Sequence, residues 1–109
     1  MVIISDTAKF VEVRTTFEKI DEARYLAAKM LDARLVACVK ISEVESSYVF
    51  EGALRAHKEL QVCMVTCKAL LKRCEKFIKA NHPYKVPQII AMPLFASKDY
   101  GKWVKRSVR

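Results

Sequence analysis

The chain has 109 residues, about the size of one domain, and 52% of them are hydrophobic, which is enough for a single core. Twenty Lys and Arg residues against twelve Asp and Glu residues give a formal net charge of +8. No apolar run is long enough to span a membrane, and the apolar start at residues 1–5 is too short for a signal peptide, so we expect a cytoplasmic protein with no membrane segment.

The first elements are predicted to be a strand and a helix. Phe10–Thr16 alternates β-forming residues with Glu12 and Arg14, which is typical of a strand. Apolar residues then recur at helical spacing over Glu18–Ala33, and Thr16 is placed to cap this helix at its N-terminus.

The middle of the chain is rich in β-forming residues. We expect strands over Leu35–Val44, Ser46–Leu54 and Glu59–Cys67. The last of these has apolar residues on both faces, which predicts burial on both sides or contact of one side with a partner.

The second half contains the clearest helix, from Leu70 to Asn81, because apolar and basic residues fall on opposite faces. It is expected to end before Pro83, since proline disfavours a helical conformation in the preceding residue. A strand over Pro87–Phe95 and a short helix over Asp99–Val108, anchored by Trp103, complete the chain. The basic face of the helix that ends at Asn81 consists of Lys68, Lys72, Arg73, Lys76 and Lys79.

The order of elements is βαβββαβα, or βαββαβ followed by a short C-terminal helix if the two middle segments form one bent ribbon. The second order is that of an α+β, ferredoxin-like sandwich with a sheet on one side and two helices on the other. We expect residues 1–109 to form one such domain.

Four cysteines, Cys38, Cys63, Cys67 and Cys74, lie in apolar segments of a chain without an export signal. We therefore expect reduced and mostly buried thiols. Since no CxxC pair occurs, their spacing does not indicate a structural zinc site.

The two histidines are the main candidates for chemistry. His82 lies at a predicted helix end, where it either binds a metal or a polar ligand, or hydrogen-bonds to the last carbonyl groups of the helix. His57 lies in a basic stretch that we interpret as a solvated turn. No catalytic arrangement and no glycine-rich phosphate loop can be identified, so we do not expect an enzyme.

Tyr48 and Phe50 are two residues apart in a predicted strand and therefore share a face. They are either a base-stacking platform of an RNA-binding domain, whose strand order is also βαββαβ, or packing residues. The stacking motif expects a basic residue and glycine before its aromatic residues, and these are missing, so nucleic acid is not the expected partner.

Several segments together resemble the CutA-type divalent-cation-tolerance family, from about residue 10 to residue 108. The most specific are His82-Pro83-Tyr84-x-Val86-Pro87 and the ending Asp99-Tyr100-x-x-Trp103. The others are Arg34-Leu35-Val36-Ala37-Cys38-Val39, Ser46-x-Tyr48-x-Phe50-Glu51-Gly52, Glu59, Thr66 and Ile89-Ile90-Ala91-x-Pro93.

The resemblance implies a ferredoxin-like fold assembled as a homotrimer, in which long middle strands pair between subunits. It makes Tyr48, Phe50, Tyr84 and Trp103 candidates for subunit interfaces or for the clefts between them. Such clefts could also hold a small anionic ligand, as in the PII signal proteins, and a PII-like sensor or an assembly scaffold is the alternative function.

The family is linked to tolerance of divalent metals, copper above all, and the resemblance makes His82 the candidate metal ligand. Imidazole nitrogen suits Cu(II) and Zn(II). Lys85 and Gln88 stand where acidic residues are common in the family, which removes two carboxylates near His82. We therefore expect a role in the response to metal ions, with weak or conditional binding of copper or another divalent metal.

Overall fold

The computed structural model describes residues 8–109, which form a four-stranded antiparallel sheet, a short 3₁₀ turn and three α-helices. In chain order the strands and α-helices are β1 (Phe10–Phe17), α1 (Ile20–Asp32), β2 (Cys38–Phe50), β3 (Ala53–Cys67), α2 (Leu71–Asn81), β4 (Ile90–Leu94) and α3 (Lys98–Ser107).

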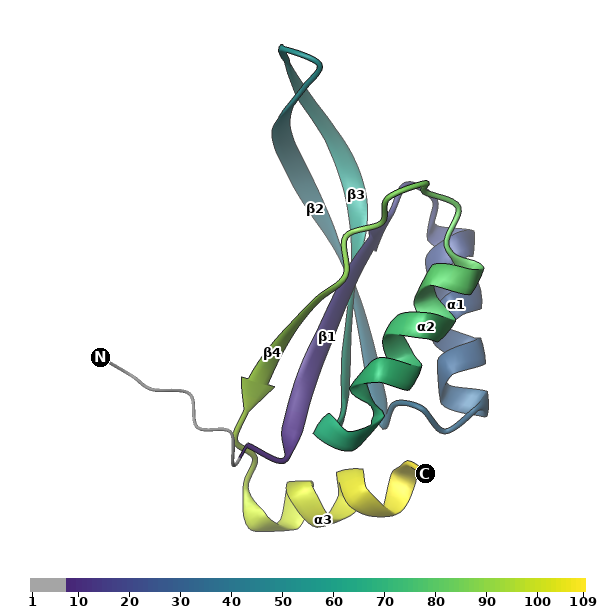
Figure 1. Ribbon diagram of the computed structural model, residues 1–109, viewed down its shortest axis with the longest axis vertical. Coiled ribbons are helices and arrows are strands. Elements are labelled where there is room, and N and C mark those ends of the chain that lie inside the picture. The colour runs from purple at the N-terminus through teal and green to yellow at the C-terminus, as the bar shows by residue number, and fades with distance from the viewer. Residues whose placement is uncertain (1–7) are drawn as a thin grey trace, which may run out of the picture.

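The strand order in the sheet is β2-β3-β1-β4, and every neighbouring pair is antiparallel. Helices α1 and α2 lie side by side on one face of the sheet, while α3 crosses the end of the molecule opposite the β2–β3 hairpin (Figure 1). The predicted α+β sandwich with the order βαββαβ and a short C-terminal helix is thus confirmed.

The two middle strands form one long hairpin. All thirteen residues of β2 pair with β3, and the strands are joined by Glu51 and Gly52 alone. Both residues have positive φ angles, 51° and 76°, as a tight two-residue hairpin turn requires, and glycine adopts this conformation most easily. The prediction of a separate strand over Ser46–Leu54 is wrong, because this turn falls inside that segment.

The hairpin is longer than the sheet that supports it. Strand β1 pairs with Leu60–Cys67 only, so within residues 8–109 the segment Ala53–Glu59 of β3 has β2 as its sole partner strand. As a result, the tip of the hairpin projects well beyond the helices (Figure 1).

The core lies between the helices and one face of the sheet. Val62 and Met64 of β3 are fully buried there, against a cluster that includes Leu26 of α1 and Cys74 and Ile78 of α2. The apolar face predicted for the helix that ends at Asn81 is confirmed. In α1, Ala23, Ala27 and Met30 are buried as predicted, but Leu31, predicted on the same face, is 43% exposed. Intervening residues of β3 on the opposite face, such as Cys63 and Val65, are only partly buried.

Most predicted elements are present with ends shifted by a few residues, but the one predicted helix cap is wrong. Thr16 lies within β1 instead of capping α1, and the N-cap residue Lys19 makes no side-chain cap bond. The cap of α3 is Ser97, whose Oγ accepts a hydrogen bond from the Tyr100 amide at 3.3 Å. The strand predicted over Pro87–Phe95 is shortened to β4.

Helix α3 packs closely on the start of β1. A Cβ atom on Gly101 would lie 2.9 Å from the Phe10 ring, so any other residue there would force this ring to shift. None of the helices within residues 8–109 is long and apolar enough to cross a membrane.

A matched pair of substitutions in α1 tests this core. Leu26 is fully buried and Leu31 is 43% exposed on the same helix. We expect Leu26→Ala to lower the free energy of unfolding by about 2–5 kcal/mol, because it removes buried methyl groups and leaves a cavity, and Leu31→Ala to lower it by less than about 1 kcal/mol. Urea unfolding at one fixed protein concentration measures both, and equal effects would contradict the assigned packing.

Candidate functional site

A groove of about 940 Å³ lies at the base of the projecting hairpin. The hairpin contributes Tyr48, His57 and Glu59 to its lining, and the segment after α2 contributes Tyr84 and Lys85. The groove forms because the chain returning from α2 to β4 passes beside the part of the hairpin that β1 does not cover.

Glu59 is the buried charge at the centre of this groove, with 7% of its surface exposed. Burial by itself raises the pKa of the Glu59 carboxyl. Hydrogen bonds from Ser46 and Tyr84 lower it, and smaller contributions from His57 and Thr16 act in the same direction. The pKa of Glu59 therefore lies below its ordinary value of 4.5, and the carboxylate is ionised at neutral pH.

Tyr84 is tied to this carboxylate. Its hydroxyl donates a hydrogen bond to Glu59 Oε2 at 3.0 Å. Burial, this hydrogen bond and the negative charges of Glu59, Glu18 and Glu22 all raise the pKa of the Tyr84 hydroxyl, which remains protonated and acts as a donor.

His57 is placed differently from the prediction of a solvated turn. It lies within β3, is partly buried and points toward the same groove. Its Nδ1 is 3.3 Å from the Tyr48 hydroxyl, and its Nε2 is 3.7 Å from Glu59 Oε2. The sequence signal that could have revealed this pair is the His57-x-Glu59 spacing, which puts both side chains on one face of a strand.

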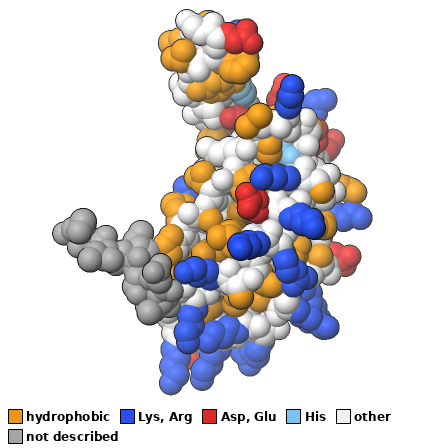
Figure 2. All heavy atoms as spheres, in the orientation of Figure 1, with side chains coloured by type: hydrophobic (Ala, Val, Ile, Leu, Met, Phe, Trp, Pro, Cys, Tyr) orange, Lys and Arg blue, Asp and Glu red, His pale blue; other side chains and the backbone are white. Residues whose placement is uncertain are grey.

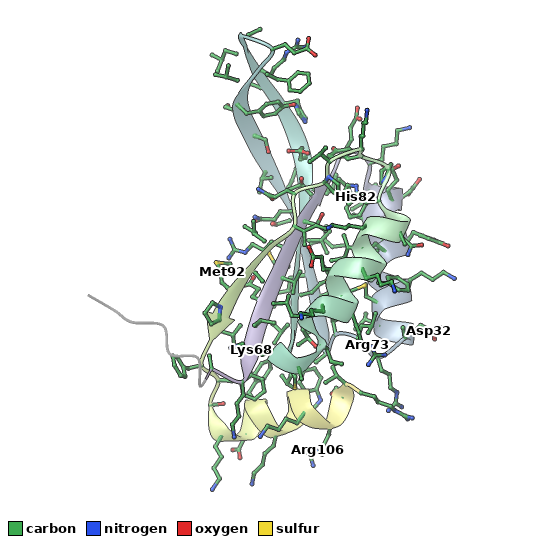
Figure 3. All side chains as sticks on the ribbon, in the orientation of Figure 1. Asp32, Lys68, Arg73, His82, Met92 and Arg106 are labelled. Carbon is green, nitrogen blue, oxygen red and sulfur yellow. The ribbon has the colours of Figure 1, made fainter. Side chains whose placement is uncertain are left out.

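His82, predicted as the metal ligand, has both ring nitrogens engaged by the backbone. Nε2 is 2.8 Å from the Thr16 carbonyl oxygen, to which it donates, and Nδ1 accepts from the Tyr84 amide at 3.1 Å. The ring also stacks on Phe17 at a centroid distance of 4.2 Å, beside the end of α2 (Figure 3). These contacts fix His82 as a link between β1 and the segment after α2.

Burial lowers the pKa of His82, against smaller opposing effects of the Thr16 carbonyl and of Glu22 and Glu59. The neutral ring matches its hydrogen bonds, because the Nδ1 that accepts from the Tyr84 amide cannot also carry a proton. A metal ion at Nδ1 would have to displace that amide. The assignment of His82 as a ligand stays a prediction.

The four predicted interface or cleft residues fall into two places. Tyr48, Phe50 and Tyr84 all line the groove, whereas Trp103 lies on α3, 42% exposed and 5.5 Å from the Tyr100 ring. The Tyr48 ring meets His57 edge-on at a centroid distance of 5.5 Å, so it already has a partner within the hairpin.

The cysteines are free, as predicted, but only Cys74 is fully buried. The other three are half-buried, because they lie on or near the sheet face that the helices α1 and α2 do not cover. Burial raises the pKa of Cys74 to about 11 and also raises those of Cys63 and Cys67. These three thiols are therefore protonated at neutral pH, whereas metal binding and redox chemistry need the thiolate.

Most of the positive charge lies away from the groove. Lys and Arg side chains gather over α3 and the start of α2 (Figure 2). The groove itself contains the carboxylates of Glu18 and Glu59 against the single ammonium group of Lys85. Among residues 8–109, no group of three or more His, Cys, Asp and Glu side chains is arranged to hold a metal ion.

Comparison of the sequence with known proteins identifies the family of this chain. The sequence profile described as "CutA1 divalent ion tolerance protein" matches residues 11–107. The chain belongs to this family. The resemblance noted from the His82 segment and the Trp103 ending is thereby confirmed.

Relatives in the divalent ion tolerance family include plant and bacterial proteins. "Protein CutA, chloroplastic" of Arabidopsis thaliana is 33% identical over 96% of this chain, and this chain spans 59% of that relative's length. "Divalent-cation tolerance protein CutA" of Escherichia coli O139:H28 is 32% identical over 96% of this chain and 95% of the relative. Since one relative is chloroplastic, a cytoplasmic location stays a prediction for this chain.

Solved structures of the family share the fold. The crystal structure of CutA1 from Oryza sativa superposes with a TM-score of 0.89 at 33% identity, covering 96% of this chain and 98% of that one. The family is named for tolerance of divalent ions and not for a catalysed reaction.

The contact between Tyr84 and Glu59 can be tested by Tyr84→Phe. A carboxyl group whose pKa is lowered by folding stabilises the folded state above its ordinary pKa, and this contribution is lost as the pH falls through the folded-state value. Removing the hydroxyl should raise the pKa of Glu59. We therefore expect the variant to be less stable than the natural chain at pH 7 and the difference to shrink in acid, as measured by urea unfolding across pH.

Tyr25→Phe is the control, because Tyr25 is 55% exposed on α1, outside the groove. Carbon-13 NMR of the Glu59 carboxyl gives its pKa directly. An unchanged pKa in Tyr84→Phe would show that the hydroxyl does not act on Glu59 in solution.

Proposed function

We propose that this chain works as a homotrimeric divalent-cation-tolerance protein that takes part in the response to metal ions and binds copper or another divalent metal weakly or conditionally. The observation that carries the proposal is the projecting hairpin, whose open edge and exposed apolar side chains support contact with further copies of the chain. Membership of the divalent ion tolerance family supplies the link to metal ions.

The hairpin exposes apolar side chains that a single chain does not cover. Val49 is 71% exposed, Phe50 54% and Leu54 79%, all close to the turn. Val86, in the segment beside the groove, is 86% exposed. Exposed apolar patches of this kind are typical of protein–protein interfaces.

The backbone of the hairpin supports the same conclusion. Within the described residues 8–109, β2 is an edge strand along its whole length, and Ala53–Glu59 of β3 has an open edge where β1 has ended. Long edge strands pair readily with other chains unless they are covered, so pairing between subunits would satisfy these backbone groups. The open edges support pairing with at least one further copy, and the family resemblance implies three.

Weak metal binding is supported by the ligands available in one chain. His82 is held by two backbone hydrogen bonds, and Cys74 is buried and protonated. A tight site normally combines three or four protein ligands, and residues 8–109 of one chain bring no such group together.

The two alternative functions have less support. A small anion in the groove would meet the carboxylates of Glu18 and Glu59 with only Lys85 to attract it. A base-stacking platform would need a free Tyr48 ring, and that ring packs against His57.

Light scattering tests the assembly. We expect a mass of three times the 12.5 kDa of one chain at low micromolar concentration. Leu54→Glu should weaken the assembly, because it places a charge in an apolar contact, and the matched control Leu31→Glu on α1 should leave the mass unchanged. A natural chain that stays monomeric, or a Leu54→Glu variant with undiminished assembly, would contradict the proposal.

A further inference from the structure

The groove contains an imidazole and a carboxylate that face each other without a direct hydrogen bond. His57 and Glu59 are two residues apart in β3 and share the face that lines the groove. The distance between His57 Nε2 and Glu59 Oε2 is 3.7 Å, longer than the 2.7–3.2 Å of an N–H···O hydrogen bond.

Each of the two groups also has other polar partners. The Glu59 Oε2 atom that faces His57 accepts the hydrogen bond of the Tyr84 hydroxyl, Ser46 also hydrogen-bonds to the carboxylate, and His57 Nδ1 lies 3.3 Å from the Tyr48 hydroxyl. In the tautomer that donates from Nδ1 to Tyr48, the lone pair of Nε2 points at a carboxylate oxygen. Two such acceptors repel each other unless a positively charged species lies between them.

The separation suits a bridging metal ion. Zn(II) binds histidine nitrogen and carboxylate oxygen at about 2.0–2.2 Å, so two such bonds at a tetrahedral angle place the ligand atoms about 3.4 Å apart. The observed 3.7 Å differs from this by a few tenths of an ångström. A small side-chain rotation would close the difference.

The net negative charge of the groove lining also favours binding of a cation. The carboxylates of Glu18 and Glu59 outnumber the ammonium group of Lys85 in the lining. Lys58, next to His57 in the sequence, is directed to Glu43, with Nζ 3.5 Å from Oε1. A divalent cation therefore enters an environment of net negative charge, although the chain as a whole is basic.

We propose that His57 and Glu59 form a two-ligand site in the groove for a divalent transition-metal ion that prefers imidazole nitrogen and carboxylate oxygen, as Zn(II) and Cu(II) do. The inference rests on the metal binding in the proposed function and moves its site from His82 to the hairpin. Water fills the remaining coordination positions, which makes the binding weak and readily reversible.

The Tyr48 hydroxyl has a supporting role in this site. It holds the ring of His57 through Nδ1 and so directs Nε2 toward Glu59. Hydrogen bonds of this kind to the second nitrogen of a histidine ligand orient the ring and fix its tautomer. Tyr84 and Ser46 do the same for the carboxylate.

The chain has only two histidines, so nitrogen-15 NMR of the imidazoles can assign the site directly. The full chain in its assembled state is titrated with Zn(II). We expect the His57 ring nitrogens to shift on addition of zinc while those of His82 remain unchanged. By calorimetry, His57→Gln and Glu59→Gln should each weaken zinc binding at least about tenfold, and the matched control His82→Gln should keep the natural affinity. The mass and circular dichroism of each variant report whether it is folded.

The outcomes separate this inference from the proposed function. Zinc binding that is unchanged in folded His57→Gln, or lost only in folded His82→Gln, overturns the His57–Glu59 site and leaves metal binding by the chain intact. If the natural chain binds neither zinc nor copper, this result contradicts both the His57–Glu59 site and the metal binding in the proposed function. A Glu59→Gln variant that fails to fold leaves the decision to His57→Gln and to the NMR shifts.

Discussion

The difference in length between two neighbouring strands determines most of what is distinctive in this structure. β3 has fifteen residues and β1 has eight, and their pairing begins only at Leu60. The hairpin therefore continues beyond the sheet, with β2 as the only partner of Ala53–Glu59 in the part of the chain that the structure describes. The unpaired backbone and the exposed apolar side chains at this projection are the observations on which the proposed assembly rests.

The groove follows from the same difference. Where β1 ends, Glu59 loses a neighbouring strand and is covered instead by Tyr84 from the segment after α2. His82 fixes that segment to the Thr16 carbonyl at the end of β1. The two histidines therefore have different positions. His82 connects β1 with the segment after α2 through backbone hydrogen bonds, whereas His57, together with Glu59, lines the groove.

Much of the fold could be predicted from the sequence, because buried faces leave a periodic pattern. Most apolar residues at helical spacing in α1 and α2 are buried in the core. Val62, Met64 and Thr66, which alternate along β3, are buried as well. The turn at Gly52 was missed because the flanking residues favour strands on both sides of it. The roles of the two histidines could not be predicted, since they depend on contacts between residues far apart in the chain, such as that of His82 with Thr16.

Amide hydrogen exchange in β3 tests most directly whether the projecting hairpin is completed by another copy of the chain. Alternate amides of Ala53–Glu59 point away from β2 and have no partner strand within residues 8–109 of one chain. Pairing between subunits predicts that these amides exchange slowly at concentrations where the chain is assembled and faster on dilution to the monomer. Rapid exchange of the outward-pointing amides in the assembled state would mean that the open edge of β3 is not an interface.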